Sequence, residues 1–267
     1  MEDYKKIIQQ TFNSVSQGYD NNNLRFFKTS AEQMADMLKL QGEEHILDVA
    51  SGTGNVAMAV LDKLTRGMVH ATDISEKMLE QLKKKASKNN HQNITFELCD
   101  MELLNKGPVF DVTTCGFGVF FIADMLNGLQ KIKSNLKSEG RILITTFNEN
   151  FLGSLRQLFY ARLENNGIEM PPSPWEYINT PEKTQKLLAK AGYKDISITL
   201  GQHGFFLKDE QAWWDVVWNS GMQGAYEMLP KERREPFLKE HFEEISTLKT
   251  KDGIWMDVEV IFGMGYN

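Results

Sequence analysis

Short apolar segments of strand length alternate with helical patterns through the first two-thirds of the chain, and this alternation limits the possible folds more than any other feature. The apolar segments are residues 45–49, 68–72, 94–98, 109–114 and 141–147, and the helical patterns cover about 55–65, 75–89 and 123–137. A strand, a helix and a parallel strand connect by a right-handed crossover, which places the helices against the faces of the sheet. The order therefore predicts an α/β fold with a parallel sheet covered on both sides.

Residues 151–267 differ in pattern from the part before them. Two further strands are predicted at 195–200 and 255–262, and the stretch between them, about 203–254, has a mostly helical pattern. We interpret this stretch as a helical cap inserted between the last two strands rather than as a separate domain. The predicted organisation is a helical segment at 1–40, a core at 41–150 and a C-terminal part of the same fold at 151–267.

The composition argues against some classes of function. The 267 residues include 36 acidic and 30 basic ones, a formal charge of −6, whereas nucleic-acid binding needs a concentrated positive field. No apolar run approaches the roughly 18 residues of a membrane-spanning helix, and the first ten residues lack the apolar stretch of a signal peptide. We therefore expect a soluble, cytoplasmic protein that does not bind nucleic acid.

Few side chains suggest metal or acid–base chemistry. Cys99 and Cys115 lie near the ends of predicted buried strands and are expected to be reduced and apolar in character. No His, Asp and Glu cluster at ligand spacing stands out, so no metal is expected. His203, directly after a predicted strand, is a candidate general base, with a turn residue as the alternative, and His241 is expected to be exposed on a charged helix.

A pair of glycines, Gly52 and Gly54, follows the first strand, where a turn into a helix is predicted. Glycines there permit a tight turn and leave backbone N–H groups open to a ligand, although such turns are also glycine-rich for packing reasons. Asp48, Asp73 and Asp100 lie at the ends of three successive strands. Because open α/β sheets bind ligands at this edge, the three acids together predict a binding site there.

Each acid also has a purely structural explanation. Asp48 could cap the turn, Asp73 could begin the next helix, and Asp100 could be an ordinary loop carboxylate. In a functional site, Asp73, 19 residues after Gly54, lies where dinucleotide-binding proteins hold ribose hydroxyls. The same loop would suit NAD, with Ala57 in the third glycine position, so an NAD-dependent oxidoreductase is one alternative, although no second mononucleotide half is recognisable.

A series of motifs that includes the glycine loop resembles the class I S-adenosylmethionine-dependent methyltransferases. These motifs are LDVASGTGN (47–55), ATDIS (71–75), LCDMELL (98–104), FDVTTCGFGVFFIAD (110–124) and LKSEGRILITTF (136–147). Together with SVSQGYD (14–20), their spacing is most similar to the UbiE-like type, the ubiquinone/menaquinone C-methyltransferases. The resemblance covers about residues 10–150 and is looser beyond them.

The resemblance implies a Rossmann-like, seven-stranded, mostly parallel sheet with an antiparallel last strand. It also implies S-adenosylmethionine as cofactor and S-adenosylhomocysteine as product, with Asp73 on the ribose and Asp100 and Met101 on the adenine. The residues that it places around the cofactor are Tyr19, Asp48, Ala50, Ser51, Gly52, Thr53, Gly54, Asp73, Ile74, Met78, Asp100, Met101, Glu102, Cys115, Gly116 and Phe117. Tyr19 would belong to an N-terminal lid, and a helix-packing role is its alternative.

Three segments depart from the family pattern. Ala50 stands where a glycine usually precedes the glycine pair, and it is small enough for cofactor binding to survive. Residues 138–140, SEG, replace the usual Pro-Gly-Gly in a surface turn. Residues 120–124, FFIAD, stand where quinone-type enzymes often carry Arg-Asn, which argues against a quinone precursor as the acceptor.

Aromatic residues indicate where a methyl acceptor would bind. The candidates are Phe120, Phe121, Trp175, Trp213, Trp214 and Trp218. Trp214 and Trp218 share one face of a helix, which is equally the pattern of an ordinary helix core. We expect in-line methyl transfer to a carbon or oxygen of a small, apolar or aromatic metabolite. A non-catalytic protein that binds S-adenosylmethionine is the second alternative.

Overall fold

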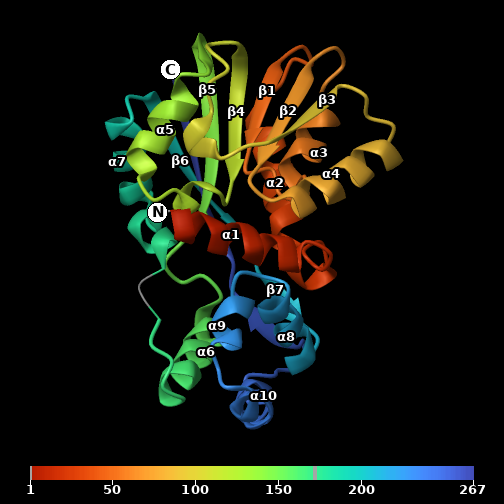
Figure 1. Cartoon of the computed structure of the whole chain (residues 1–267), viewed down its shortest axis with the longest axis vertical. Helices are drawn as coiled ribbons and strands as arrows, with labels where there is room; N and C mark the ends of the chain where they lie inside the picture. Colours follow the sequence, from red (N-terminus) through yellow and green to blue (C-terminus); the bar gives the residue numbers. More distant parts are fainter. Residues whose placement is uncertain (1, 171–172) are drawn as a thin grey trace.

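A twisted seven-stranded sheet forms the upper part of the molecule (Figure 1). The computed structural model describes residues 2–170 and 173–267. In spatial order the strands are β3 (Ile94–Leu98), β2 (Met68–Asp73), β1 (His45–Val49), β4 (Phe110–Gly116), β5 (Leu136–Phe147), β9 (Glu259–Tyr266) and β6 (Lys194–Gln202). Only β9 is antiparallel to its neighbours β5 and β6. The predicted fold, a mostly parallel sheet with an antiparallel last strand, is confirmed.

Helices cover the sheet and extend below it. The helices beside the sheet are α2 (Phe26–Met37), α3 (Asn55–Leu61), α4 (Glu76–Lys88), α5 (Met125–Lys133) and α7 (Pro181–Lys190). Side chains begin two of them: Ser75 accepts a hydrogen bond from the N–H of Met78, and Thr180 accepts one from Lys183. Their apolar faces pack on strands such as β1 and β4, whose residues are almost completely buried.

A layer of helices lies beneath the sheet in Figure 1. It contains α6 (Gly153–Asn165), α8 (Glu210–Trp218), α9 (Gln223–Glu227) and α10 (Lys231–Ser246). The last three fall within the stretch 203–254, between β6 and β9, as the sequence predicts. Helix α6, which the sequence did not indicate, joins them because Arg162 pairs with Glu240 and Glu244 of α10 at 2.5 and 3.1 Å.

The predicted strand at 255–262 is wrong in its extent. It is two strands: β8 (Ile254–Met256), which pairs with β7 (Phe205–Leu207), and β9, which continues to Tyr266. The break falls at Asp257 and Val258, where the side chain of Gln202 makes hydrogen bonds in place of those between strand backbones. Its amide donates to Asp257 at 2.8 Å, and its oxygen accepts from the N–H of Val258 at 3.3 Å.

Helix α1 (Glu2–Val15) crosses the lower end of the sheet, between the strands and the helical layer (Figure 1). Two side-chain contacts attach it to the end of β2. Gln9 donates to the carbonyl of Ile74 at 2.8 Å, and Asn13 accepts from the hydroxyl of Ser75 at 2.7 Å. The first helix therefore covers the carboxyl ends of the parallel strands, the edge where the sequence predicts a ligand site.

His241 is buried inside the helical layer, so the expectation that it is exposed is wrong. Its Nε2 accepts a hydrogen bond from the indole of Trp213 at 2.9 Å. Among residues 2–170 and 173–267, its Nδ1 has no hydrogen-bond partner and lies 3.7 Å from a carboxylate oxygen of Glu244. Burial lowers the pKa of His241 to about 4, although Glu244 acts in the opposite direction. The imidazole is therefore neutral and accepts a hydrogen bond from the indole N–H, and this bond joins α8 to α10.

Acidification should weaken the helical layer through His241. The folded state resists protonation of this imidazole until about pH 4, whereas the unfolded chain takes up the proton near pH 6.5. The contribution of His241 to stability therefore falls as the pH drops from 6.5 towards 4. Between pH 7.5 and 5 this contribution should fall by about 2 kcal/mol, measured in guanidinium unfolding as the difference between the wild type and a variant that does not titrate at this position.

His241→Gln is the matched control, because an amide oxygen accepts from Trp213 without titrating. This variant should show a smaller loss of stability between the two pH values. Equal losses in both proteins would mean that the imidazole does not carry the effect.

Candidate functional site

The turn between β1 and α3 is built from backbone in the left-handed region. Ala50, Gly52 and Gly54 have φ angles of +52°, +56° and +90°. The turn is held by the N–H of Ser51, which donates to the carbonyl of Thr72 at 2.9 Å, and by a bond from Gly54 N–H to Ser51 O at 2.8 Å. A residue with a side chain adopts this conformation at a cost of order 1 kcal/mol, which applies to Ala50.

The two glycines serve different purposes. A Cβ atom on Gly52 would meet no other atom within 4 Å, so its backbone faces open space. A Cβ atom on Gly54 would lie 2.1 Å from Cδ1 of Leu82 in α4. Gly52 therefore leaves room beside the turn, whereas Gly54 allows the turn to pack against a helix.

Asp73, at the end of β2, connects this turn to the next helix. One carboxylate oxygen accepts from the N–H of Gly52 at 2.8 Å, and the other accepts from the N–H of Ser75 at 2.7 Å. Burial raises the pKa of Asp73, and the backbone amides that bond to it oppose the rise. The carboxylate of Asp73 therefore holds the turn in place and also lines the space beside Gly52.

Asp48 has an unsatisfied oxygen. Its Oδ1 accepts from the hydroxyl of Thr114 at 2.7 Å, but among the described residues its Oδ2 has no hydrogen-bond partner although it is fully buried. Burial raises the pKa of Asp48 to about 7, although the hydroxyls of Thr114 and Ser51 and the N–H of Ala57 oppose the rise. A buried carboxylate oxygen without a donor is costly, which makes Oδ2 a natural acceptor for a bound cation or N–H group.

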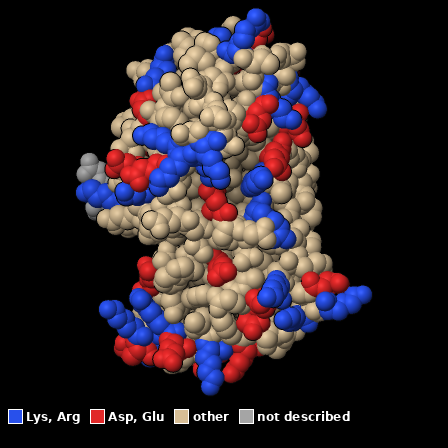
Figure 2. Space-filling view, turned by 90° about the vertical axis from the view of Figure 1, so that its right-hand side faces the viewer, with Lys and Arg blue, Asp and Glu red and all other residues tan. Residues whose placement is uncertain are grey.

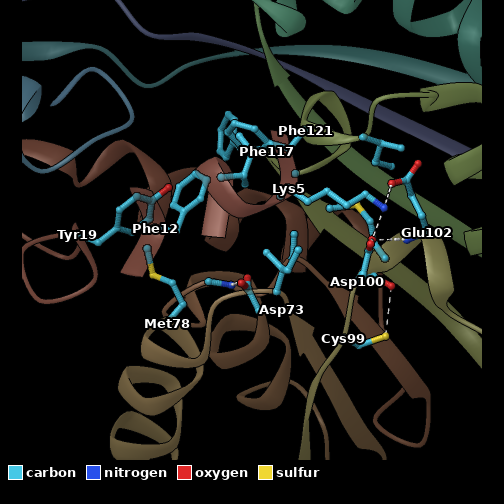
Figure 3. Close-up of a pocket in the computed structure, with 18 residues that line it drawn as sticks. Lys5, Phe12, Tyr19, Asp73, Met78, Cys99, Asp100, Glu102, Phe117 and Phe121 are labelled. Carbon is cyan, nitrogen blue, oxygen red and sulfur yellow. Dashed lines mark hydrogen bonds and ion pairs between the residues drawn. The ribbon is translucent and has the colours of Figure 1, made fainter. Parts of the chain in front are cut away.

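Asp100, after β3, forms the third part of the edge. Its carboxylate accepts from the N–H of Glu102 at 2.9 Å and pairs with Lys5 of α1 at 2.5 Å. Lys5 also pairs with Glu102. Figure 3 shows the Lys5 side chain pointing from α1 towards both carboxylates. These contacts hold α1 over the strand ends.

The strand ends and α1 enclose two small connected spaces, which we call the polar pocket. The first is lined by Lys5, Ile8, Phe12, Tyr19, Ala50, Gly52, Asp73, Ile74, Met78, Cys99, Asp100, Met101, Glu102, Gly116, Phe117, Gly118, Phe121 and Ile122 (Figure 3). The second adds Asp48, Ser51 and Thr53, among others. Of the residues predicted around a cofactor, 14 therefore lie at the polar pocket.

Two predicted cofactor residues lie elsewhere. Gly54 borders a polar groove on the other side of the turn. Cys115 is buried within the sheet and lines none of these spaces, because its side chain lies against Gly118 rather than at the strand end. Sequence reasoning missed Lys5, Ile8 and Phe12, whose only signal is that they share one face of the first helix.

A larger cavity of about 500 Å³ lies between the polar pocket and the helical layer, and we call it the aromatic cavity. Its size is within the range of small-molecule sites. Its aromatic lining residues are Tyr4, Phe12, Tyr19, Phe26, Phe27, Phe117, Phe120, Phe121, Phe147, Phe151, Tyr160 and Trp175. Many of these rings contact one another, such as Phe117 and Phe147, stacked with centroids 4.5 Å apart.

The polar pocket and the aromatic cavity meet at a ring-lined junction. Both are lined by Ile8, Phe12, Tyr19, Phe117 and Phe121. Tyr19 is stacked on Phe27 with centroids 4.8 Å apart. Burial, with Asp20 and Asp73 nearby, raises the pKa of Tyr19, so its phenol is neutral at ordinary pH. The junction is thus apolar and uncharged.

The predicted acceptor residues divide into two groups. Phe120, Phe121 and Trp175 line the aromatic cavity, and their role in acceptor binding stays a prediction. The α8 tryptophans lie away from it, which corrects their assignment to the pocket. Trp213 is buried against His241, and Trp214 and Trp218 pack against Tyr226, leaving Trp218 42% exposed. Their helical spacing belongs to the core of the helical layer.

His203 is also away from both cavities, so it is not placed to act as a general base. Its ring nitrogens are hydrogen-bonded to Thr29 at 2.9 Å and Gln33 at 3.0 Å in α2. Burial lowers its pKa. The residue fastens the end of β6 to α2, the structural role that the sequence left open.

Other kinds of site are not evident in the part of the chain that the structure describes. Across residues 2–170 and 173–267, no three His, Cys, Asp or Glu side chains are grouped so that they could hold a metal ion. None of the helices in these two ranges is both long and apolar enough to cross a membrane.

The fold and the site define a class I S-adenosylmethionine-dependent methyltransferase. The profile described as the ubiE/COQ5 methyltransferase family matches residues 1–165, and the chain belongs to this family. This confirms the resemblance, the enzyme class and S-adenosylmethionine as cofactor, in preference to an NAD-dependent oxidoreductase.

Relatives share the matched region at moderate identity. Aklanonic acid methyltransferase DauC from Streptomyces sp. strain C5 is 28% identical over 64% of this chain and 80% of its own length. Demethylmenaquinone methyltransferase from Lactococcus lactis is 32% identical over 59% of this chain, and the match spans 65% of its length, just under two thirds. The magnesium protoporphyrin IX methyltransferase of Synechocystis, solved with bound S-adenosylhomocysteine, has the same fold at 15% identity, with a TM-score of 0.62 and coverage of 99% and 100%.

The two glycines should respond differently to alanine. Gly52→Ala adds a side chain in open space and should cost only the left-handed backbone penalty, about 1–2 kcal/mol. Gly54→Ala adds a collision with Leu82 and should cost about 1–3 kcal/mol more, measured by chemical unfolding. Combining Gly54→Ala with Leu82→Ala should destabilise the protein less than the sum of the two single changes. Equal costs at both glycines would contradict the packing role of Gly54.

Proposed function

We propose that this enzyme transfers the methyl group of S-adenosylmethionine to a carbon or oxygen of a small aromatic or apolar molecule bound in the aromatic cavity. The observation that carries the proposal is the junction, where a pocket edged by four carboxylates, those of Asp48, Asp73, Asp100 and Glu102, opens into an aromatic cavity of about 500 Å³. A polar ligand and an apolar one can meet there.

The polar pocket suits the cofactor in chemistry. Oδ2 of Asp48 lacks a donor that the cofactor's ammonium group would supply, and the open space beside Gly52 leaves room for its amino-acid end. Asp73 would hold the ribose, and Asp100 with Met101 would hold the adenine. The space beneath α1 is about 80 Å³, so α1 or the side chains that line the pocket would move when the cofactor enters.

When bound, the cofactor supplies a methyl group already activated by its sulfonium. The chain's own part is to hold the acceptor atom in line with that methyl group, and such positioning is worth roughly 7–11 kcal/mol. Phe12, Phe117 and Phe121 would form the walls of this path and keep water out of it.

The junction offers no general base. Of the described residues that line both spaces, only Tyr19 is ionisable, and its raised pKa keeps it protonated. The acceptor atom should therefore be nucleophilic before it arrives, as the oxygen of a phenolate or the carbon of an enolate is. The named acceptors of two relatives, aklanonic acid and demethylmenaquinone, are both small molecules, which supports this class.

Methyl transfer can be followed with S-adenosylmethionine labelled in its methyl group. Incubation of the protein with labelled cofactor and a cell extract should put label into small molecules that partition into organic solvent. Asp48→Asn, nearly identical in shape, should lower the yield by weakening cofactor binding. Label confined to protein or nucleic acid would contradict the proposed acceptor class.

Cofactor affinity should depend on the ionisation of Asp48. In the free protein its pKa is about 7, and a bound ammonium group favours the carboxylate. Binding below pH 7 must therefore release a proton, so the Kd for S-adenosylhomocysteine should be about tenfold weaker at pH 6 than at pH 8 by calorimetry. In Asp48→Asn this part of the pH dependence should disappear. An unchanged pH dependence in that variant would place the ammonium group elsewhere.

A further inference from the structure

Arg156 of α6 has the only charged side chain among the described residues that line the aromatic cavity. On the basis of the function proposed above, we propose that the acceptor is an elongated aromatic acid whose anionic group pairs with Arg156. Apart from Arg156, the lining consists of aromatic and aliphatic side chains, glycines and a few hydroxyl-bearing residues, without a carboxylate. A guanidinium in a wall that carries no carboxylate of its own attracts an anion and disfavours a cation.

The guanidinium is held in position rather than mobile. Its carbon lies 5.1 Å from the ring centre of Tyr160 and 4.9 Å from that of Trp175, and both rings line the same cavity. The side chain is only 24% exposed. A cation fixed between two rings loses little conformational freedom when it binds a ligand, which favours a planar partner such as a carboxylate.

The existing ion pair leaves part of this guanidinium available. Nη2 of Arg156 donates to Glu176 at 2.9 Å, and this is its only hydrogen bond within the described ranges. Glu176 does not line the aromatic cavity but, with Glu164 and Glu169, lines a groove that Arg156 also borders. Arginine has five N–H donors and only one of them donates to Glu176, so the others remain for an acid group that reaches Arg156 from the cavity.

The wall of the cavity sets the length of such an acceptor. Phe117, at the junction, stacks on Phe147 with ring centroids 4.5 Å apart. The ring of Phe147 in turn lies next to that of Trp175, with centroids 6.2 Å apart, and the guanidinium of Arg156 lies over the Trp175 ring. Two rings thus separate the junction from the guanidinium. A molecule of two or three fused rings would reach from one to the other. Its acid group would then be an anchor, held apart from the atom that receives the methyl group.

Glu176 should compete with the acceptor for Arg156. Its side chain is 38% exposed, so it can turn into solvent at little cost when an acid group binds. Removing its charge should therefore strengthen the binding of an anion and leave a neutral molecule of the same shape unaffected.

Two fluorescent probes with the same ring system, one anionic and one neutral, test whether Arg156 binds an acid group. Anthracene-2-carboxylate and 2-anthracenemethanol have the same three rings, and their binding to the protein saturated with S-adenosylhomocysteine can be followed by anisotropy. The wild type should bind the carboxylate at least about tenfold more tightly than the alcohol, which is the range of a charged hydrogen bond. Arg156→Met should abolish this preference with little effect on the alcohol. Glu176→Gln should increase the preference a few-fold.

Matched controls distinguish the loss of the Arg156 contact from misfolding and from failure to bind the cofactor. Arg66→Met removes an arginine that is also paired with a glutamate but is 77% exposed, and it should leave the preference unchanged. If Arg156→Met does not fold, Glu176→Gln still tests the proposal. Equal binding of the two probes to the wild type, or an unchanged preference in Glu176→Gln, would overturn it. Failure to bind S-adenosylhomocysteine by calorimetry would instead contradict the proposed function.

Discussion

The carboxylate of Asp73 connects the ends of two neighbouring strands, and the rest of the site depends on this connection. Its two oxygens accept the N–H groups of Gly52 and Ser75, so one side chain fixes the turn after β1 and the start of α4. Helix α1 then docks on the same place, through Ile74 and Ser75. Because the carboxylate is buried, these amides also stabilise its charge. The turn after β1 therefore positions Asp73, and Asp73 in return fixes the turn.

The division between polar and apolar spaces follows from the architecture. Parallel strands end at one edge, where the acids and free amides collect. The aromatic wall comes from the N-terminal segment, the turn after β4, and the end of β5 with the segment that follows it. The profile of the molecule in Figure 2 is indented between these two parts, and uncharged residues predominate on the visible walls of the indentation. The two spaces are separate and share Phe117 and Phe121, and in the proposed function the methyl donor would bind in one and the aromatic acceptor in the other.

The sequence predicted the sheet and its edge well because both follow from local patterns. Strand and helix periodicity defined the order of the core, and the glycine turn with Asp48 and Asp73 marked the strand ends. The aromatic cavity was predicted only in part, since helical spacing identifies a face without showing what covers it. Trp214 pairs with Tyr226 in the helical layer, a contact between segments that no local pattern reveals. The docking of α1 through Lys5 depends in the same way on tertiary structure.

In the proposed function, the cofactor's sulfur lies where the polar pocket opens into the aromatic cavity. A crystal structure with S-adenosylhomocysteine would locate this sulfur. We expect the ammonium group at Oδ2 of Asp48 and the sulfur facing the aromatic cavity between Phe117 and Phe121. An ammonium group bound away from Asp48, or a sulfur separated from that cavity by protein, would contradict it.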